Sequence, residues 1–465
     1  MKGMQACRDK HAKDIPRPHV SGDTTMDIAK RISRRRFVKQ SASLAAVGMA
    51  APTIIPSGVL GAPGRPGAND RIGVAYIGAG RRANQLMGLP PEGRIVAAAD
   101  VDRTRAEAVA AKRKCRAYQD YRKMLESKDI DAVFVATPDH WHVLPSIHAC
   151  QAGKDVYLEK PLSLTIREGR ILVDAVRKYE RVLQTGSMHR SMSGNRRGCE
   201  LVRNKLAGKI HTVIILNYPS PWECDLPGQT VPTGLDWDAW CGMTDPVPFH
   251  NDIFTQRSNP GWISFRPYSG GEMTGIGAHG FDQIQWALGM DHTGPVEVWV
   301  EGGKLDPVVY SKPESRPRGN ALCSRGHRVR FRYANGVIVR LEGNGPGAGG
   351  EFRGDQGKIR FSGGEVSSNP VELAETPPEN LEFRLPPINN HTQNWFDCIK
   401  SREKPIADVE IGHRSATICH LGNIARWVGR KLRWDPEREI FPGDDEANSY
   451  VDRPRRKPYE LPDPV

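Results

Sequence analysis

The stretch that decides the fold is RIGVAYIGAGRRA, residues 71–83. It begins with a short apolar run typical of a buried strand and ends in the pattern G-x-G-x-x-A, formed by Gly78, Gly80 and Ala83. In this pattern Gly78 allows a tight turn, Gly80 lets the backbone approach a pyrophosphate, and the helix that follows offers N–H groups to the anion. We therefore expect a dinucleotide to contact the residues of this turn: Gly78, Ala79, Gly80, Arg81 and Arg82.

An acidic residue at the end of the second expected strand favours NAD as the dinucleotide. The run RIVAAAD ends in Asp100, 22 residues after Gly78. A carboxylate at this position accepts hydrogen bonds from the adenosine ribose hydroxyls and would repel the 2′-phosphate of NADP. The alternative interpretation of Asp100 is a helix cap.

Two further apolar segments continue the alternation of strands and helices. They are DAVFVATP, residues 131–138, and DVYLEKPLS, residues 155–163. Because ligands bind at the carboxyl ends of parallel strands, a set of polar residues and one proline is expected at the cofactor edge. This set is Thr137, Pro138, His142, Glu159 and Lys160. A purely structural role for His142 is an equal alternative. Partial desolvation can lower the pKa of a lysine there toward a useful acid–base range.

Four features together resemble the Gfo/Idh/MocA family of oxidoreductases over about residues 71–431. They are the glycine pattern, ATPDHWH (136–142), EKP (159–161) and the helix expected in GGEMTGIGAHGFDQIQWALG (270–289). The resemblance implies an α/β N-terminal Rossmann domain and an α+β C-terminal domain with a large, mostly antiparallel sheet. It also implies a homo-oligomer, because that sheet commonly mediates oligomers.

The second half of the chain agrees with this expectation. The segments 211–218, 327–344 and 358–363 have the composition of strands, and ANG at 334–336 predicts a hairpin turn. Closing helices are expected within 389–405 and 412–432. The predicted divisions are an N-terminal extension with a signal (1–62), a linker (63–70), an NAD-binding domain (71–186), a substrate and oligomerisation domain (187–434) and an extended tail (435–465), which would wrap a neighbouring subunit.

The resemblance implies two catalytic residues. Lys160 would touch both nicotinamide and substrate, and His279 would be the acid/base. These residue types suit the oxidation of an alcohol, because the hydroxyl proton needs a base and the developing oxyanion needs a nearby cation. Histidine titrates near neutral pH, so it suits the first task.

The chain departs from many relatives at Gly275, where they carry Asp four residues before the histidine. On one helix, positions 275, 279 and 282 share a face, so Asp282 is expected to orient or charge His279. A structural pair with a basic group at the domain interface is the alternative for Asp282. Glu272 is a further candidate for the missing acid.

The substrate end is defined by fewer signals. Arg190 follows the Rossmann segment and is predicted to hydrogen-bond a sugar, with an interface salt bridge as the alternative. Four tryptophans lie in a Pro-rich insert, and we expect one of them at the site. They are Trp222, Trp237, Trp240 and Trp262.

The N-terminus resembles a twin-arginine export signal. Arg34 and Arg35 are followed by Phe37, Lys39 and a weakly apolar stretch that is too short to span a bilayer. The alternative is a basic, disordered tail. We expect export to the periplasm through the twin-arginine machinery, with the protein folded around its cofactor.

Charge and cysteine content exclude several other classes. Residues 1–70 carry 12 Lys/Arg and 5 Asp/Glu, which is +7 of the total +12, so the remainder carries only +5 and no nucleic-acid partner is expected. The nine cysteines form no C-x-x-C pair, which argues against a zinc site and a disulfide framework. No metal is predicted.

The leading hypothesis is an exported NAD-dependent oxidoreductase acting on a CH–OH group of a sugar, glycoside or cyclitol. The first alternative is an NAD-dependent glycoside hydrolase that uses transient oxidation and elimination. The second is a non-catalytic sugar-binding relative that lost its acid at position 275.

Overall fold

The computed structural model describes residues 67, 70–255, 260–306, 308–311, 326–462 and 465, all of which belong to one compact unit. The predicted signal and most of the predicted linker lie outside the described residues. Among the described helices, none combines the length and the apolar composition needed to cross a membrane.

The N-terminal half forms a parallel sheet of six strands in the order β3-β2-β1-β4-β5-β6, which confirms the predicted Rossmann domain. The strands are β1 Ile72–Ile77, β2 Gly93–Ala99, β3 Arg116–Tyr118, β4 Ala132–Val135, β5 Asp155–Leu158 and β6 Leu183–Thr185. The helices between and after them are α2 Arg81–Gln85, α3 Arg103–Arg113, α4 Tyr121–Leu125, η2 Asp139–Trp141, α5 Val143–Gln151, α6 Ile166–Lys178 and η3 Met188–Ser191. Apolar cores on both sides of the sheet explain why its central strands are almost continuously apolar.

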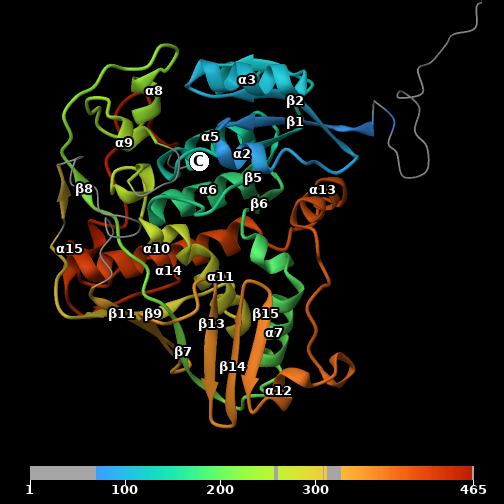
Figure 1. Cartoon of the computed structure of the whole chain (residues 1–465), viewed down its shortest axis with the longest axis vertical. Helices are drawn as coiled ribbons and strands as arrows, with labels where there is room; N and C mark the ends of the chain where they lie inside the picture. Colours follow the sequence, from blue (N-terminus) through green and yellow to red (C-terminus); the bar gives the residue numbers. More distant parts are fainter. Residues whose placement is uncertain (1–66, 68–69, 256–259, 307, 312–325, 463–464) are drawn as a thin grey trace, which may run out of the picture. The chain divides into compact units, whose positions relative to one another are not determined.

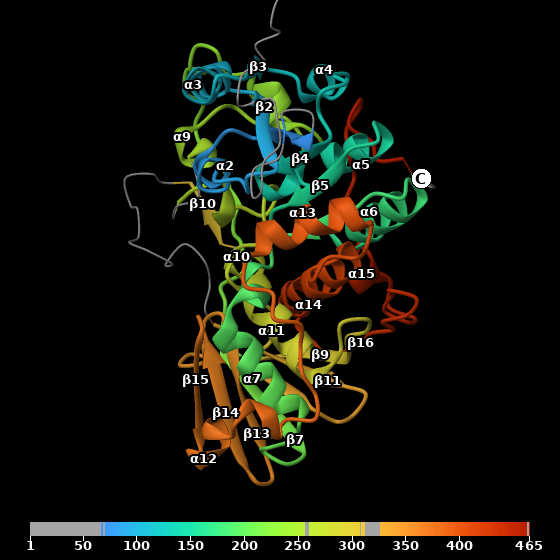
Figure 2. The same ribbon diagram turned by 90° about the vertical axis from the view of Figure 1, so that its right-hand side faces the viewer.

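A helix from the far end of the sequence completes this domain. α13 (His391–Ser401) returns from the second half, and Figure 2 shows it next to β5. Trp395 packs edge-on against Phe134 of β4, with ring centroids 4.9 Å apart. The sequence predicted that the NAD-binding domain ends at residue 186. The structure adds to this domain the helix α13, which lies about 200 residues further along the chain.

The second half forms an eight-stranded sheet in the order β15-β14-β13-β7-β12-β11-β9-β16. Its strands are β7 Ile210–Leu216, β9 Pro295–Glu301, β11 Arg328–Tyr333, β12 Ile338–Glu342, β13 Gly349–Gly354, β14 Gly357–Ser362, β15 Glu365–Asn369 and β16 Leu432–Arg433. Only the β7–β12 pair is parallel, so the expectation of a mostly antiparallel sheet is confirmed. The predicted hairpin joins β11 to β12, and Gly336 at its turn has φ +89°.

The helices on this sheet are α7 Ser193–Arg203, α10 Glu272–Gly275, α11 Gly277–Leu288 and α14 Val409–Val428, with the short α12 Glu372–Glu375 and η7 Pro378–Asn380 at its edge. Figure 1 shows α10, α11 and α14 between the two sheets. α11 is buried along most of its length and packs closely against Tyr218. The approach is close enough that a Cβ on Gly280 would lie only 2.1 Å from the Tyr218 hydroxyl oxygen. A larger residue at position 280 would force the side chains of Tyr218 and Ile215 to move.

Two segments lie outside these layers and reach the Rossmann domain. The insert, which we define as residues 219–255 and 260–268, carries β8 Glu223–Cys224, α8 Trp237–Cys241, α9 Asn251–Phe254 and η4 Trp262–Ser264 around an aromatic core shared with β10 Val309–Tyr310. The tail, residues 435–462, contains α15 Asp445–Asn448. Arg453 of the tail pairs with Glu168 of α6 in the same chain at 2.8 Å. The predicted extended tail thus folds back onto its own chain.

Candidate functional site

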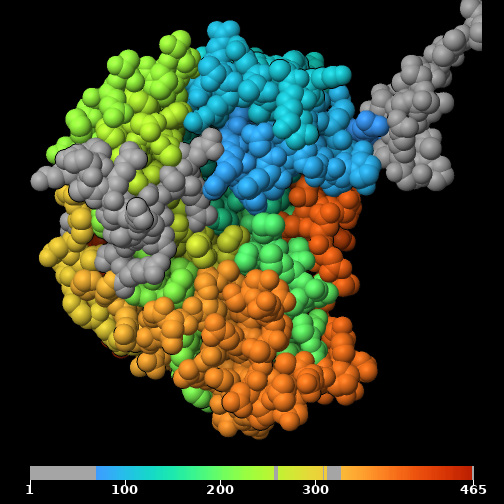
Figure 3. Space-filling model, viewed as in Figure 1, coloured from blue at the N-terminus to red at the C-terminus, as the bar shows by residue number. Residues whose placement is uncertain are grey.

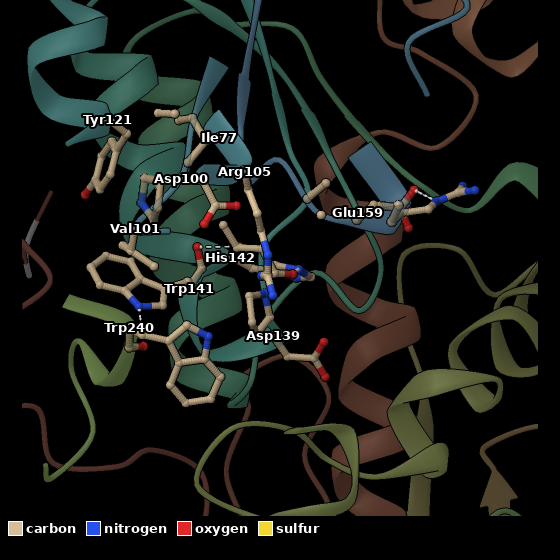
Figure 4. A pocket seen from close by; sticks show the side chains of 18 of the residues that line it. Ile77, Asp100, Val101, Arg105, Tyr121, Asp139, Trp141, His142, Glu159 and Trp240 are labelled. Carbon is tan, nitrogen blue, oxygen red and sulfur yellow. Dashed lines mark hydrogen bonds and ion pairs between the residues drawn. The ribbon is translucent and has the colours of Figure 1, made fainter. Parts of the chain in front are cut away.

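A cavity of about 610 Å³ opens at the carboxyl ends of the parallel strands (Figure 4). Most of the predicted site residues line it: Gly78, Gly80, Arg81, Arg82, Asp100, Thr137, Pro138, His142, Glu159, Lys160 and His279. Gly275, Trp240 and Trp262 line it as well. The edge of the sheet that sequence assigned to the cofactor is therefore hollow, and both predicted catalytic side chains face the same hollow.

The glycine turn has the geometry that a dinucleotide requires. Gly78 has φ +89°, and a Cβ there would lie 2.8 Å from the carbonyl oxygen of Ala136. A Cβ on Gly80 would meet no protein atom within 4 Å. The chain thus leaves the space beside Gly80 for a ligand, and these residues fit a pyrophosphate.

Asp100 lies beside this turn at the end of β2. Its Oδ2 accepts from the Ala79 N–H at 2.7 Å and its Oδ1 accepts from the Asp102 N–H at 2.9 Å. Burial raises the pKa of Asp100, and these two N–H donors oppose that shift. The N-cap of α3 is Asp102, which accepts from the Thr104 N–H, so the cap alternative for Asp100 is wrong. Asp100 faces the cavity and fits the ribose.

Three of the cofactor-edge residues also hold the strand ends together. Glu159 accepts from the Arg82 guanidinium at 2.8 Å, which links β5 to α2. The Thr137 hydroxyl donates to the Trp141 carbonyl oxygen. The His142 ring lies between the carbonyl oxygens of Pro161, at 2.6 Å, and Thr137, at 3.1 Å, so the structural role considered for it is present.

Lys160 and His279 come from different domains and line one cavity. The Lys160 ammonium donates to the carbonyl oxygen of Gly275 at 2.8 Å. His279 stacks against His189 of η3, with ring centroids 4.3 Å apart and an angle of 15° between the planes. Burial and the nearby Lys160 charge lower the pKa of His189, while the Ala348 carbonyl opposes this shift.

Arg190 and Asp282 bind each other, which corrects two predictions. Arg190 is only 1% exposed, and its Nε lies 2.9 and 3.0 Å from the two carboxylate oxygens of Asp282. Its other two nitrogens donate to Asp291. Neither Arg190 nor Asp282 is among the residues that line the cavity. The interface ion pair, considered as the alternative for both, is what forms, and its carboxylates offset the cost of burying the guanidinium.

The ion pair is strongly held. Although burial lowers the pKa of Arg190, Asp282 and Asp291 raise it above its ordinary value. Asp282 also accepts from the Ser415 hydroxyl of α14 at 3.1 Å. Arg190 therefore ties η3 to α11 and holds the neighbouring His189 against His279.

Glu272 serves the junction between α10 and α11. Its Oε2 accepts from the Ile276 N–H at 3.2 Å, four residues further along. This contact stabilises the point where the expected continuous helix is broken into two. Glu272 lies one helical turn before Gly275, which lines the cavity, but Glu272 is not itself among the lining residues.

Sequence reasoning missed several residues at the site. His189 had no signal of its own, since its partner lies 90 residues away. Tyr121, Trp141 and Tyr459 also line the cavity and come from α4, η2 and the tail. Trp141 lies inside the ATPDHWH motif that drew attention for other residues, whereas nothing in the sequence near Tyr459 indicates a ligand.

Comparison with known proteins agrees with this geometry. Residues 72–187 match the model described as the oxidoreductase family, NAD-binding Rossmann fold, and residues 209–461 match that of the oxidoreductase family, C-terminal alpha/beta domain. The rhizopine catabolism protein MocA of Rhizobium meliloti is 25% identical over 48% of this chain and 59% of its own length. Inositol 2-dehydrogenase 1 of Saccharopolyspora erythraea is 35% identical over 26% of this chain and 36% of its own length. The match thus spans less than two thirds of the length of each of these two curated relatives.

Solved structures share the fold. The WlbA dehydrogenase from Bordetella pertussis, in complex with NADH and UDP-GlcNAcA, has a TM-score of 0.55 at 16% identity, covering 78% of this chain and 99% of that one. The aldose-aldose oxidoreductase from Caulobacter crescentus has a TM-score of 0.53 at 17% identity over the same shares. With both family models matched in order and the cavity at their junction, the chain belongs to the Gfo/Idh/MocA family of NAD-binding oxidoreductases.

Proposed function

We propose that this protein is an exported NAD-dependent oxidoreductase that acts on a CH–OH group of a sugar, glycoside or cyclitol. The observation that carries the proposal is the convergence of Lys160 and His279 on the cavity that also contains the glycine turn and Asp100. The names of similar proteins, inositol 2-dehydrogenase and aldose-aldose oxidoreductase, support a polyhydroxylated substrate.

NAD, when bound, supplies the acceptor for the hydride. Gly78 and Gly80 would hold its pyrophosphate, and Asp100 would hold its ribose. His279 accepts the proton of the substrate hydroxyl, a task for which an imidazole is suited near neutral pH. The Lys160 ammonium, oriented by the Gly275 carbonyl oxygen, stabilises the negative charge that develops on the substrate oxygen.

The stack of His189 on His279 orients the proposed base. Two imidazolium rings at 4.3 Å would repel each other, and burial already disfavours the charge on His189. Burial thus favours the uncharged form of His189, and the stacked ring of His189 restricts the orientation of the His279 ring. Arg190, Asp282 and Asp291 act as positioning residues, since they fix η3 against α11.

The cellular setting completes the proposal. The Arg34-Arg35 segment supports export of the folded protein, which would leave the cytoplasm with NAD already bound. The large second sheet supports assembly into a homo-oligomer. The partners are thus a small carbohydrate and the export machinery.

Product analysis tests the function. The purified protein and its His279→Ala variant are incubated with a panel of glycosides, free sugars and cyclitols, and native mass spectrometry records bound NAD. A keto product formed by the wild type but not by the variant supports the proposal. Release of an aglycone without a keto product would instead indicate cleavage through transient oxidation. Binding of a sugar with no product at all would contradict an enzymatic function.

A further inference from the structure

We propose that the insert and the tail form the outer wall of the adenosine end of the NAD site, so that the dinucleotide is a resident group that exchanges slowly. The inference rests on the proposed cofactor but not on the substrate. It assigns a role in retaining NAD to two segments that lie outside both sheets, and above all to Tyr459 and Arg456 of the tail.

The insert is joined to the strand end that carries the ribose acceptor. Leu235 forms a β-bridge with Asp102, and the backbone N–H of Asp236 donates to the Val101 carbonyl oxygen at 3.0 Å. The Arg105 guanidinium lies over the ring of Phe254, 4.3 Å from its centroid. Figure 3 shows the yellow-green atoms of the insert meeting the light blue atoms of the Rossmann domain. The insert therefore covers the turn that follows Asp100.

The insert is also held from the other side of the cavity. Trp240 offers its carbonyl oxygen to two residues of η2, the ring nitrogen of His140 at 2.8 Å and the indole N–H of Trp141 at 2.9 Å. Ser269, just after the insert, donates to the Asp139 carboxylate at 2.7 Å. These bonds are buried, so they are not weakened by competition with water.

The tail closes the same wall. Arg456 donates to the carbonyl oxygens of Gly242 at 2.6 Å, Thr244 at 3.1 Å and Asp238 at 2.8 Å, all in the insert. Three residues later the Tyr459 ring meets Trp141 edge-on, with centroids 5.4 Å apart, and is 8% exposed. The tail thus donates hydrogen bonds to the insert through Arg456 and packs against the Rossmann domain through Tyr459.

The wall has the chemistry of an adenine site. Tyr121, Trp141, Trp240 and Tyr459 line the cavity together with Asp100. Figure 4 shows the first three on the side of Asp100 that lies away from Glu159. If the ribose is at Asp100, the base attached to it lies toward these rings, and aromatic faces stack well on a flat heterocycle. A dinucleotide bound in this way would contact the insert, the tail and η2 at its adenosine end, and loss of these contacts would speed its release.

Exchange of the bound dinucleotide tests the proposal directly. The holoprotein is mixed with excess isotope-labelled NAD, and native mass spectrometry follows the replacement of the unlabelled molecule. Tyr459→Ala removes the tail ring, Arg456→Ala releases the tail from the insert, and Lys457→Ala is the matched control, because this side chain lies between the two and is 88% exposed. We expect slow exchange in the wild type and the control, and at least tenfold faster exchange in the other two variants.

Either of two results would overturn the enclosure: replacement of NAD in the wild type as fast as mixing, or unchanged exchange in both tail variants while circular dichroism shows that they are folded. Failure of the wild type to bind NAD at all would overturn both the enclosure and the proposed function. Turnover of the sugar panel is measured on the same samples. Fast exchange with turnover contradicts only the enclosure, and slow exchange without turnover contradicts only the enzymatic function.

Discussion

Replacing Asp282 by asparagine should destabilise the fold, because it removes one carboxylate from a buried guanidinium. Arg190 is 1% exposed and its Nε bonds only to Asp282, while Asp291, the other partner, is 19% exposed at its side chain. Asparagine keeps the shape but not the charge. Removing one partner of a buried ion pair costs about 3–5 kcal/mol. Since Asp291 still compensates part of the charge, we expect a loss at the low end, about 3 kcal/mol.

Urea unfolding followed by fluorescence measures this loss as a shift of the midpoint at constant slope. Asp291→Asn is the matched control on the same arginine. It should cost less, about 1 kcal/mol, because its carboxylate is partly solvated. A loss below about 0.5 kcal/mol for Asp282→Asn, the range of ordinary surface changes, would refute the structural role. If that variant were as stable as the wild type but shifted the pH–rate profile, Asp282 would act on His279 as first predicted.

Three other predictions follow from the cofactor site, the export signal and the buried histidines. Asp100→Ala should weaken binding of NAD more than that of NADP in titrations, because the 2′-phosphate gains from losing a carboxylate; an equal loss for both would remove the ribose assignment. Replacing Arg34 and Arg35 by lysine should keep the active protein in the cytoplasm, which cell fractionation checks against an unchanged periplasmic pool. Burial lowers the pKa of His391 and of His420 from 6.5 to about 4, so below pH 6.5 the unfolded chain binds protons that the folded chain does not. Stability should then fall by about 1.4 kcal/mol per pH unit for each of them as the pH drops from 6.5 to 4, and unfolding midpoints that stay flat over this window would contradict their neutral burial.

The cofactor site was predictable because its signals are local. The turn at Gly78 and Gly80 needs its special backbone within a few residues of β1, and Asp100 follows one strand later. Parallel strands then bring their carboxyl ends together by topology alone, which is why Lys160 could be placed at the same edge. In the second sheet, apolar runs and a hairpin motif located β7, β11, β12 and β14, whereas β9, β13, β15 and β16 were not among the predicted strands. The mostly antiparallel arrangement of that sheet was implied by the family resemblance.

The rest depends on contacts between distant residues. Helical periodicity correctly predicts that Asp282 and His279 lie near each other on α11. It carries no information about Arg190, which lies 92 residues earlier in the chain and binds the Asp282 carboxylate. The same limit applies to the return of α13 to the first domain and to Tyr459 of the tail. Polar or irregular segments have no period from which a docking position can be derived, so their place emerges only from the folded chain.

The measurement that tests the central claim most directly is reduction of the bound NAD in a single turnover. The wild type, His279→Ala and Lys160→Ala are loaded with NAD and mixed with the sugar and cyclitol panel, and the formation of NADH is followed by absorbance. The account predicts reduction in the wild type with at least one compound, and a rate lower by about 10²–10⁴-fold in both variants while their NAD remains bound. Reduction at the wild-type rate in both variants would contradict the assignment of Lys160 and His279 to the chemistry.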